Sequence, residues 1–165
     1  MKKWILLLLI GATFLCGCSK QTPELQKPVS FYYVPAEYSF NVTDSAILPE
    51  LREGNGIDEL SEMIALYLKG PVDPELHSPF PPGTKLLRLE QADQTLILTL
   101  SDDFASIQGH KLTLACAVIS KTCLELSDCV NIQIRAESAT LDGEKFIEMN
   151  ASSLLLLDNA EPENH

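Results

Sequence analysis

Few residues of the chain have both the type and the spacing that catalysis requires. Ser101 directly precedes Asp102 and Asp103, a combination that raises the question of a nucleophile or a cation site. No GxSxG motif surrounds Ser101, and the run lacks the glycine and the distal glutamate of a calcium-binding loop. We therefore interpret Ser101 as the end of a strand and the two aspartates as the start of a helix, where negative charge is favourable.

Metal and acid–base sites find equally little support. His77, His110 and His165 are widely spaced, and none has a second type of ligand at metal-binding spacing. The abundant carboxylates include none in an apolar sequence context that would raise its pKa. No glycine-rich phosphate-binding loop is present. We therefore expect a protein that is not an enzyme and that holds neither a metal nor a cofactor.

Three cysteines in the second half of the chain allow two interpretations. Cys116 and Cys123 are seven positions apart on an expected helix, a rise of about 10.5 Å. The Cα atoms of a disulfide lie within about 7 Å, so this pair cannot close. Cys123 can pair with Cys129 if the chain turns sharply between them. The alternative, which we favour, is that all three are small apolar core residues.

The N-terminus predicts export. Met1-Lys2-Lys3 is followed by an apolar run over residues 4–15, and about 12 residues fit a signal peptide better than a spanning helix of roughly 20. Leu15-Cys16-Gly17-Cys18 then resembles the bacterial lipobox. The resemblance implies cleavage before Cys18 and a diacylglycerol on its sulfur, whereas an ordinary secretory signal with two incidental cysteines is the alternative.

These features divide the chain into a signal peptide over residues 1–17, a polar tether over 18–28, a single domain over 29–157 and an acidic tail over 158–165. The chain has 12 Lys and Arg against 23 Asp and Glu, a formal net charge of -11. Nucleic acid is therefore not an expected partner, because a polyanion needs a basic face. We expect an extracytoplasmic protein that reaches the membrane only through the lipid on Cys18.

Periodicity predicts an α+β fold, with two helices packed on one face of a small mixed or antiparallel sheet. Asn55 is the expected N-cap of the first helix, and Gly70-Pro71 its stop signal. A proline-rich connection over residues 72–83 separates that helix from a hairpin. The expected strands are 31–34, 38–42, 87–90, 96–100, 130–135 and a short final strand at 154–157; the expected helices are 57–68 and 107–126.

Several clusters in this order resemble the GerMN domain of bacterial sporulation and spore-germination lipoproteins. They are FYYV at 31–34, LYLKGP at 66–71, PPGTKL at 81–86, LTLSDDF at 98–104 and VNIQIRA at 130–136. The resemblance implies an extracytoplasmic protein-interaction module of envelope assemblies, a class not known for catalysis. Some family members carry two such domains in tandem, whereas this chain has room for one.

Our leading hypothesis is accordingly a lipid-anchored interaction module of a cell-envelope complex, serving sporulation or germination. The alternatives are an accessory or enzymatic role in peptidoglycan turnover and a small-ligand-binding lipoprotein. Phe80 is the only large aromatic residue of the proline-rich connection, so we expect it to anchor an envelope protein partner, with Leu76 and His77 as neighbours. Packing of Phe80 onto the domain's own helices is the competing interpretation.

Overall fold

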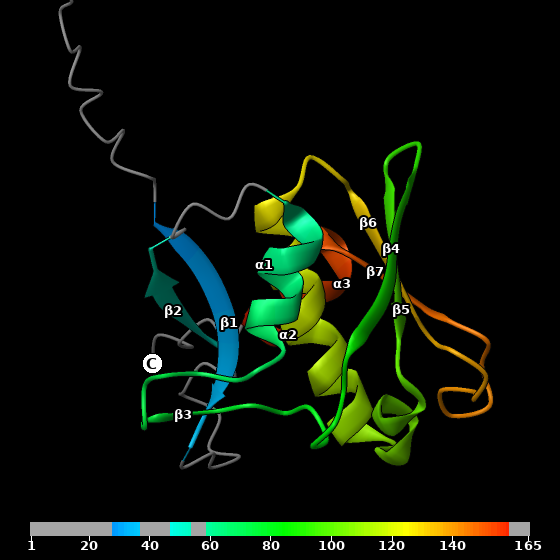
Figure 1. The fold of residues 1–165 in the computed structure, drawn as a ribbon, viewed down its shortest axis with the longest axis horizontal. Helices are drawn as coiled ribbons and strands as arrows, with labels where there is room; N and C mark the ends of the chain where they lie inside the picture. The colour runs from blue at the N-terminus through cyan, green and yellow to red at the C-terminus, as the bar shows by residue number, and fades with distance from the viewer. Residues whose placement is uncertain (1–27, 37–46, 54–58, 159–165) are drawn as a thin grey trace, which may run out of the picture.

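Two β-sheets enclose a layer of helices in the computed structural model, which describes residues 28–36, 47–53 and 59–158 (Figure 1). The three-stranded sheet has the order β2 (Leu48–Arg52), β1 (Val29–Pro35), β3 (Leu76–His77). The four-stranded sheet has the order β4 (Leu86–Ala92), β5 (Thr95–Leu100), β6 (Asn131–Ala136), β7 (Ile147–Asn150). The helices are α1 (Leu60–Tyr67), α2 (His110–Leu126) and α3 (Ala151–Asp158), with a 3₁₀ helix, η1, at Asp102–Ser106.

The four-stranded sheet is mixed. β4 and β5 form an antiparallel hairpin whose turn contains Asp93 at a φ of 52°. β5 and β6 run parallel, and the chain between them passes through η1 and α2. Parallel neighbours need a crossover of this kind, because a tight turn cannot join them. β7 then returns antiparallel to β6.

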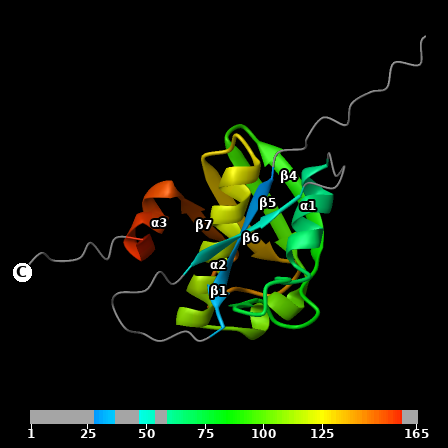
Figure 2. The ribbon, with the colours of Figure 1, turned by 90° about the vertical axis from the view of Figure 1, so that its left-hand side faces the viewer.

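Burial follows the alternation of the strands. Leu96, Leu98 and Leu100 of β5 are buried, as are Ile132 and Ile134 of β6. α2 contacts β1 on one side and β6 and β7 on the other, and Figure 2 shows β1 crossing in front of it. A helix enclosed on both sides needs apolar residues around its whole circumference, and this explains why α2 lacks a clear polar face.

The predicted α+β class is confirmed, including a mixed sheet with two helices on one face. The structure adds the three-stranded sheet on the opposite side of these helices. Its edge strand β2 gave no strand signal, because Pro49 and Glu50 are both depleted in strands. Proline is nevertheless tolerated at a sheet edge, where its missing N–H interrupts no ladder.

Local expectations around the second helix hold in part. Asp102 and Asp103 occupy the first turn of a helix, as predicted, but that helix is the separate η1. α2 begins at His110 and not at residue 107, because Gly109 has a φ of 59°, which no α-helix accommodates. The predictions for residues 1–27, the strand at 38–42, the Asn55 cap and the tail beyond Asp158 lie outside the described residues.

The predicted final strand at residues 154–157 is wrong, because this segment belongs to α3. Four consecutive leucines carry no period, and leucine has a high helix propensity without the β-branching that favours strands. The Asn150 side chain also caps the helix, since its Oδ1 accepts a hydrogen bond of 3.1 Å from the Ser153 amide. The strand of this region is β7, where Ile147 and Met149 alternate with polar residues.

Candidate functional site

The proline-rich connection between α1 and β4 begins at a fixed helix end. Gly70 has a φ of 96°, and its amide donates a 3.0 Å hydrogen bond to the Tyr67 carbonyl. A left-handed residue after the last helical turn is the usual place for glycine, since any side chain is strained there. Pro71 follows, so α1 ends where the Gly-Pro signal predicts.

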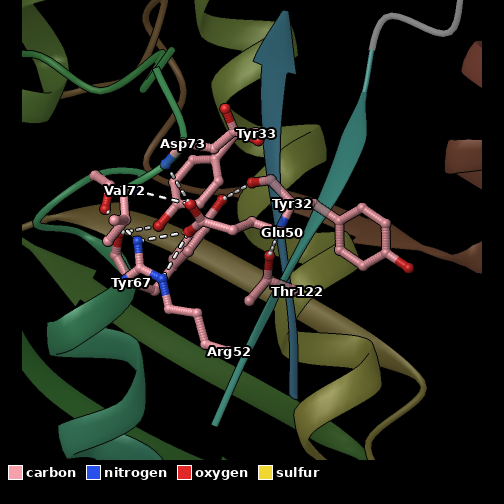
Figure 3. Close-up of polar contacts among 9 residues, drawn as sticks. Tyr32, Tyr33, Glu50, Arg52, Tyr67, Val72, Asp73 and Thr122 are labelled. Carbon is pink, nitrogen blue, oxygen red and sulfur yellow. Dashed lines mark hydrogen bonds and ion pairs between the residues drawn. The ribbon is translucent and has the colours of Figure 1, made fainter. Parts of the chain in front are cut away.

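The next residues of the connection are held by a part-buried ion pair on β2 (Figure 3). The Glu50 carboxylate accepts hydrogen bonds from the amides of Val72 at 2.8 Å and Asp73 at 2.7 Å. Arg52 donates from Nε to Glu50 at 2.6 Å and from Nη2 to the Gly70 carbonyl at 2.8 Å. Both carboxylate oxygens of Glu50, and Nε and Nη2 of Arg52, therefore contact either the backbone of the connection or the partner side chain.

These contacts set the ionisation of Glu50. Burial by itself raises the pKa of this carboxyl, but the amides of Asp73 and Val72 and the Arg52 guanidinium outweigh it and hold the pKa below its ordinary value. Glu50 is therefore an anion at neutral pH although its side chain is only 9% exposed. Its role is to fix the connection in place.

The aromatic side chains beneath the connection form one cluster, and Phe80 belongs to it. Phe80 is 8% exposed, with its ring centroid 5.4 Å from that of Tyr67 in an edge-on contact and 6.4 Å from that of Phe104. The Tyr67 hydroxyl donates to the Tyr32 carbonyl at 2.7 Å, and the Tyr33 hydroxyl donates to the Tyr67 carbonyl at 2.9 Å. Burial raises the pKa of Tyr67 well above its ordinary value.

This packing supports the competing interpretation of Phe80, in which its ring packs onto the domain itself. Flanking prolines restrict the backbone, but they do not decide which way the side chain points, and here Phe80 points into the core. Leu76 is half-buried in β3, where it pairs with Pro35 of β1, and His77 is exposed beside it. Partner binding by this connection stays a prediction.

The segment after Phe80 is a tight turn fastened to the end of β5. Thr84 donates from its amide and its hydroxyl to the Pro81 carbonyl, at 3.2 and 2.8 Å. Gly83 supplies the positive φ of 93° that the third position of this turn requires. The Ser101 hydroxyl accepts a 3.1 Å hydrogen bond from the Lys85 amide. Ser101 therefore has the structural role that its sequence context predicts.

An open groove of about 970 Å³ runs between α1 and residues 77–86, and we call it the α1 groove. Its apolar floor includes Leu68 and Phe80, and Lys69, Lys85 and His77 line it as well. None of the described residues that line it is acidic, and neither lysine forms an ion pair with a described residue. Of the three predicted partner-binding residues, Phe80 and His77 meet in this groove, whereas Leu76 lies outside it.

Sequence reasoning missed the lysines and the β2 ion pair. Lys69 and Lys85 lie on opposite sides of the connection, each next to a glycine turn, and only the fold brings them to one groove. Glu50 and Arg52 alternate with apolar Leu51, but Glu50 is buried and Leu51 is 69% exposed, so this short pattern is the reverse of an ordinary strand signal.

The described part of the chain contains no arrangement for metal or thiol chemistry. No group of three His, Cys, Asp or Glu residues there is placed to hold a metal ion. Cys116, Cys123 and Cys129 are buried free thiols, so the structure does not contain the Cys123–Cys129 bridge that the sequence left open. Burial raises the pKa of Cys116 to about 12, which disfavours its reactive thiolate. Within the same residues, no helix has the length and apolar character to cross a bilayer.

Comparison with known proteins gives one family and one fold. The family model described as Germane, sporulation and spore germination, matches residues 28–142. Two solved structures from Bacillus subtilis are similar: the tandem GerMN domains of the sporulation protein GerM, at 19% identity and a TM-score of 0.52, and the first GerMN domain of that protein, at 11% identity and a TM-score of 0.53.

The alignment to the tandem structure covers 79% of this chain and 46% of that one, so this chain spans less than half of its length. The alignment to the single domain covers 73% of this chain and 92% of that one. At such identities the likeness concerns the fold alone. No curated protein matches the chain.

Proposed function

The chain belongs to the Germane family of sporulation and spore germination, and from that premise we propose that it is a lipid-anchored, extracytoplasmic module that binds another protein of the cell envelope. We further propose that it has no catalytic role of its own and that the complex serves sporulation or germination. The groups whose pKa is raised support a non-catalytic role, because Tyr33, Tyr67, Cys116 and Cys123 are core side chains packed away from solvent.

The observation that carries the proposal is the α1 groove. It is open and apolar, its wall is fixed by the turn at Pro81–Thr84, and its cationic side chains stand out in a chain with a net charge of -11. A preformed wall lowers the entropy lost on docking. Lysines at the edge of an apolar groove favour a segment that presents apolar side chains with a carboxylate nearby.

Crosslinking in the native membrane tests the groove. A photoreactive residue at Pro82, which is exposed and lines the groove, should capture an envelope protein, and one at exposed Val130 should not. Joint replacement Lys69→Glu and Lys85→Glu should lower that capture about tenfold or more, because like charges repel across an interface. Lys111→Glu on α2, outside the groove, is the matched control. Capture that survives the double replacement would remove the α1 groove from consideration.

Anchoring has its own test. Replacement Cys18→Ala should move the protein from the membrane fraction to the soluble fraction or leave an uncleaved precursor, because the acylated sulfur is gone. Cell fractionation followed by mass spectrometry of the N-terminus measures both outcomes. Cys16→Ala is the matched control, since it leaves the cysteine at the modified position of the lipobox. A Cys18→Ala protein as membrane-bound and as mature as the wild type would refute the lipid anchor.

A further inference from the structure

A second groove lies on the opposite side of the four-stranded sheet from the helices. The three α-helices are all on one side of this sheet, and the loop over residues 137–146 (orange in Figure 1) turns outward on the other. Arg88 of β4 pairs with Thr99 of β5, which pairs with Arg135 of β6, so these side chains form one row across the sheet. The row and the loop enclose about 860 Å³. We call this space the sheet groove.

The loop that forms its wall is fastened at two places. Asp102 accepts hydrogen bonds from the amides of Ser138 at 2.9 Å and Ala139 at 3.1 Å, and from the Ser138 hydroxyl. Asp142 accepts a 2.8 Å hydrogen bond from the Gly109 amide at the start of α2. Leu141, between the two, is 1% exposed and packs in the core. The wall is thus preformed, which reduces the ordering cost of binding.

Two large apolar side chains line the sheet groove without being buried in it. Leu87 and Phe146 are each 46% exposed. Leu87 lies where the register between β4 and β5 shifts, at the step from Leu86 to Arg88. Irregularities of this kind turn a side chain out of the regular alternation. Leu86 therefore lines the α1 groove and Leu87 the sheet groove, and the two grooves share no lining residue.

The sheet groove is also cationic. Arg88, Arg135 and Lys145 line it, against the single acidic lining residue Glu137. Arg135 is held in position by hydrogen bonds from Nε to the Thr99 hydroxyl at 2.9 Å and from Nη2 to Glu90 at 2.7 Å. Glu90 offsets part of this positive charge, and its Oε2 atom also lies 4.0 Å from Nη1 of Arg88. Lys145 forms no ion pair with a described residue.

We propose that the sheet groove binds an acidic peptide segment of a partner protein that carries a large apolar side chain between its carboxylates. The apolar side chain packs between Leu87 and Phe146, and the carboxylates pair with Arg88, Lys145 and the remaining donors of Arg135. The arginine and lysine side chains of the groove are complementary to the carboxylates of such a segment, whereas two copies of the chain, each with a formal net charge of -11, repel one another overall. β1, which follows the N-terminal segment, lies beyond the helix layer, so the groove faces away from it (Figure 1). This proposal is independent of the α1 groove and of the lipid anchor.

Fluorescence anisotropy with the full chain in detergent micelles tests it. The probe is a labelled synthetic peptide, Gly-Asp-Glu-Leu-Asp-Glu-Gly, with one comparison peptide that has serine for leucine and another that has the amides for all four carboxylates. The first peptide should bind at least about tenfold more tightly than either comparison peptide. Phe146→Ala and Lys145→Glu should each weaken binding by about tenfold or more.

Matched controls separate the groove from general attraction. Val130→Ala removes a side chain that is 47% exposed and lies outside the groove, and Lys111→Glu reverses an exposed charge on α2. Both should leave the affinity unchanged. Phe146→Ala should lower the melting temperature only slightly, because its side chain is 46% exposed. Binding measured well below that temperature then reports the loss of the side chain and not unfolding.

Asp102→Ala provides a further test that separates preorganisation from charge. If charge attraction alone governs binding, removing the Asp102 carboxylate beside the groove should strengthen binding of an acidic peptide. Because Asp102 also fastens the loop, we expect its replacement to release the loop and weaken binding by about threefold to tenfold.

Two results would overturn the proposal. One is absence of binding at millimolar peptide. The other is an affinity that neither the serine replacement in the peptide nor Phe146→Ala in the protein changes, together with displacement of the peptide by inorganic polyphosphate. This result would identify a site for polyanions in general.

Discussion

Replacement Phe80→Ala should lower the free energy of unfolding by about 3–5 kcal/mol, the range for removal of a buried phenylalanine ring. The ring is 8% exposed and contacts the rings of Tyr67 and Phe104, so its loss removes the packing between these two rings. Urea denaturation followed by far-UV circular dichroism measures the change. Phe146→Ala, which removes the same ring from a site 46% exposed, should cost several times less.

The outcome also decides between the two interpretations of Phe80 that the sequence left open. If Phe80→Ala keeps the wild-type unfolding midpoint and loses capture of an envelope protein, Phe80 is a docking anchor and its core placement is incorrect. Capture by Phe80→Ala must be measured at a temperature where the variant is folded, because the ring also forms part of the floor of the α1 groove.

The parts of the fold that the sequence predicted are those whose residues alternate or repeat against a single buried layer. Leu96, Leu98 and Leu100 are the most buried residues of β5 because one face of this strand meets the helices. α2 was recognisable from its apolar spacing, and its partly apolar second side correctly indicated that it is largely buried. Because such a pattern follows from the burial of one face, it can be recognised without knowing which elements pack against that face.

The parts that escaped prediction depend on contacts between distant segments. β2 is stabilised by β1 and by the bonds of Glu50 to the connection, which its own composition does not reveal. The direction of Phe80 is set by Tyr67 and Phe104, and a proline-rich loop carries no period from which to read it. The sheet groove brings Arg88 and Arg135 to either side of Thr99 through the registers of β4, β5 and β6, and the loop before β7 adds Phe146. Its one local signal was Leu86-Leu87, where two apolar residues interrupt the alternation.

Replacement Glu50→Ala should lower the free energy of unfolding by about 1–3 kcal/mol, the cost of leaving part-buried polar groups without their hydrogen-bond partner. The change leaves the Arg52 guanidinium, whose side chain is 15% exposed, without its counter-charge, and the amides of Val72 and Asp73 without an acceptor. Urea denaturation at pH 7 measures it. Glu75→Ala removes an exposed carboxylate from the same connection and should have little effect.

The pH dependence of stability identifies the contribution of the charge itself. The pKa of Glu50 is lowered in the folded protein from its ordinary value of 4.5, so the carboxylate stabilises the fold above that value. This stabilisation is lost as the pH falls through the lower, folded-state pKa. Glu50→Gln keeps the shape of the side chain but cannot ionise. The difference in stability between wild type and Glu50→Gln should therefore be largest near neutral pH and shrink below pH 4.5. A difference that stays constant down to the lowest pH at which both proteins fold would show that hydrogen-bond geometry, and not the charge of Glu50, holds the connection against β2.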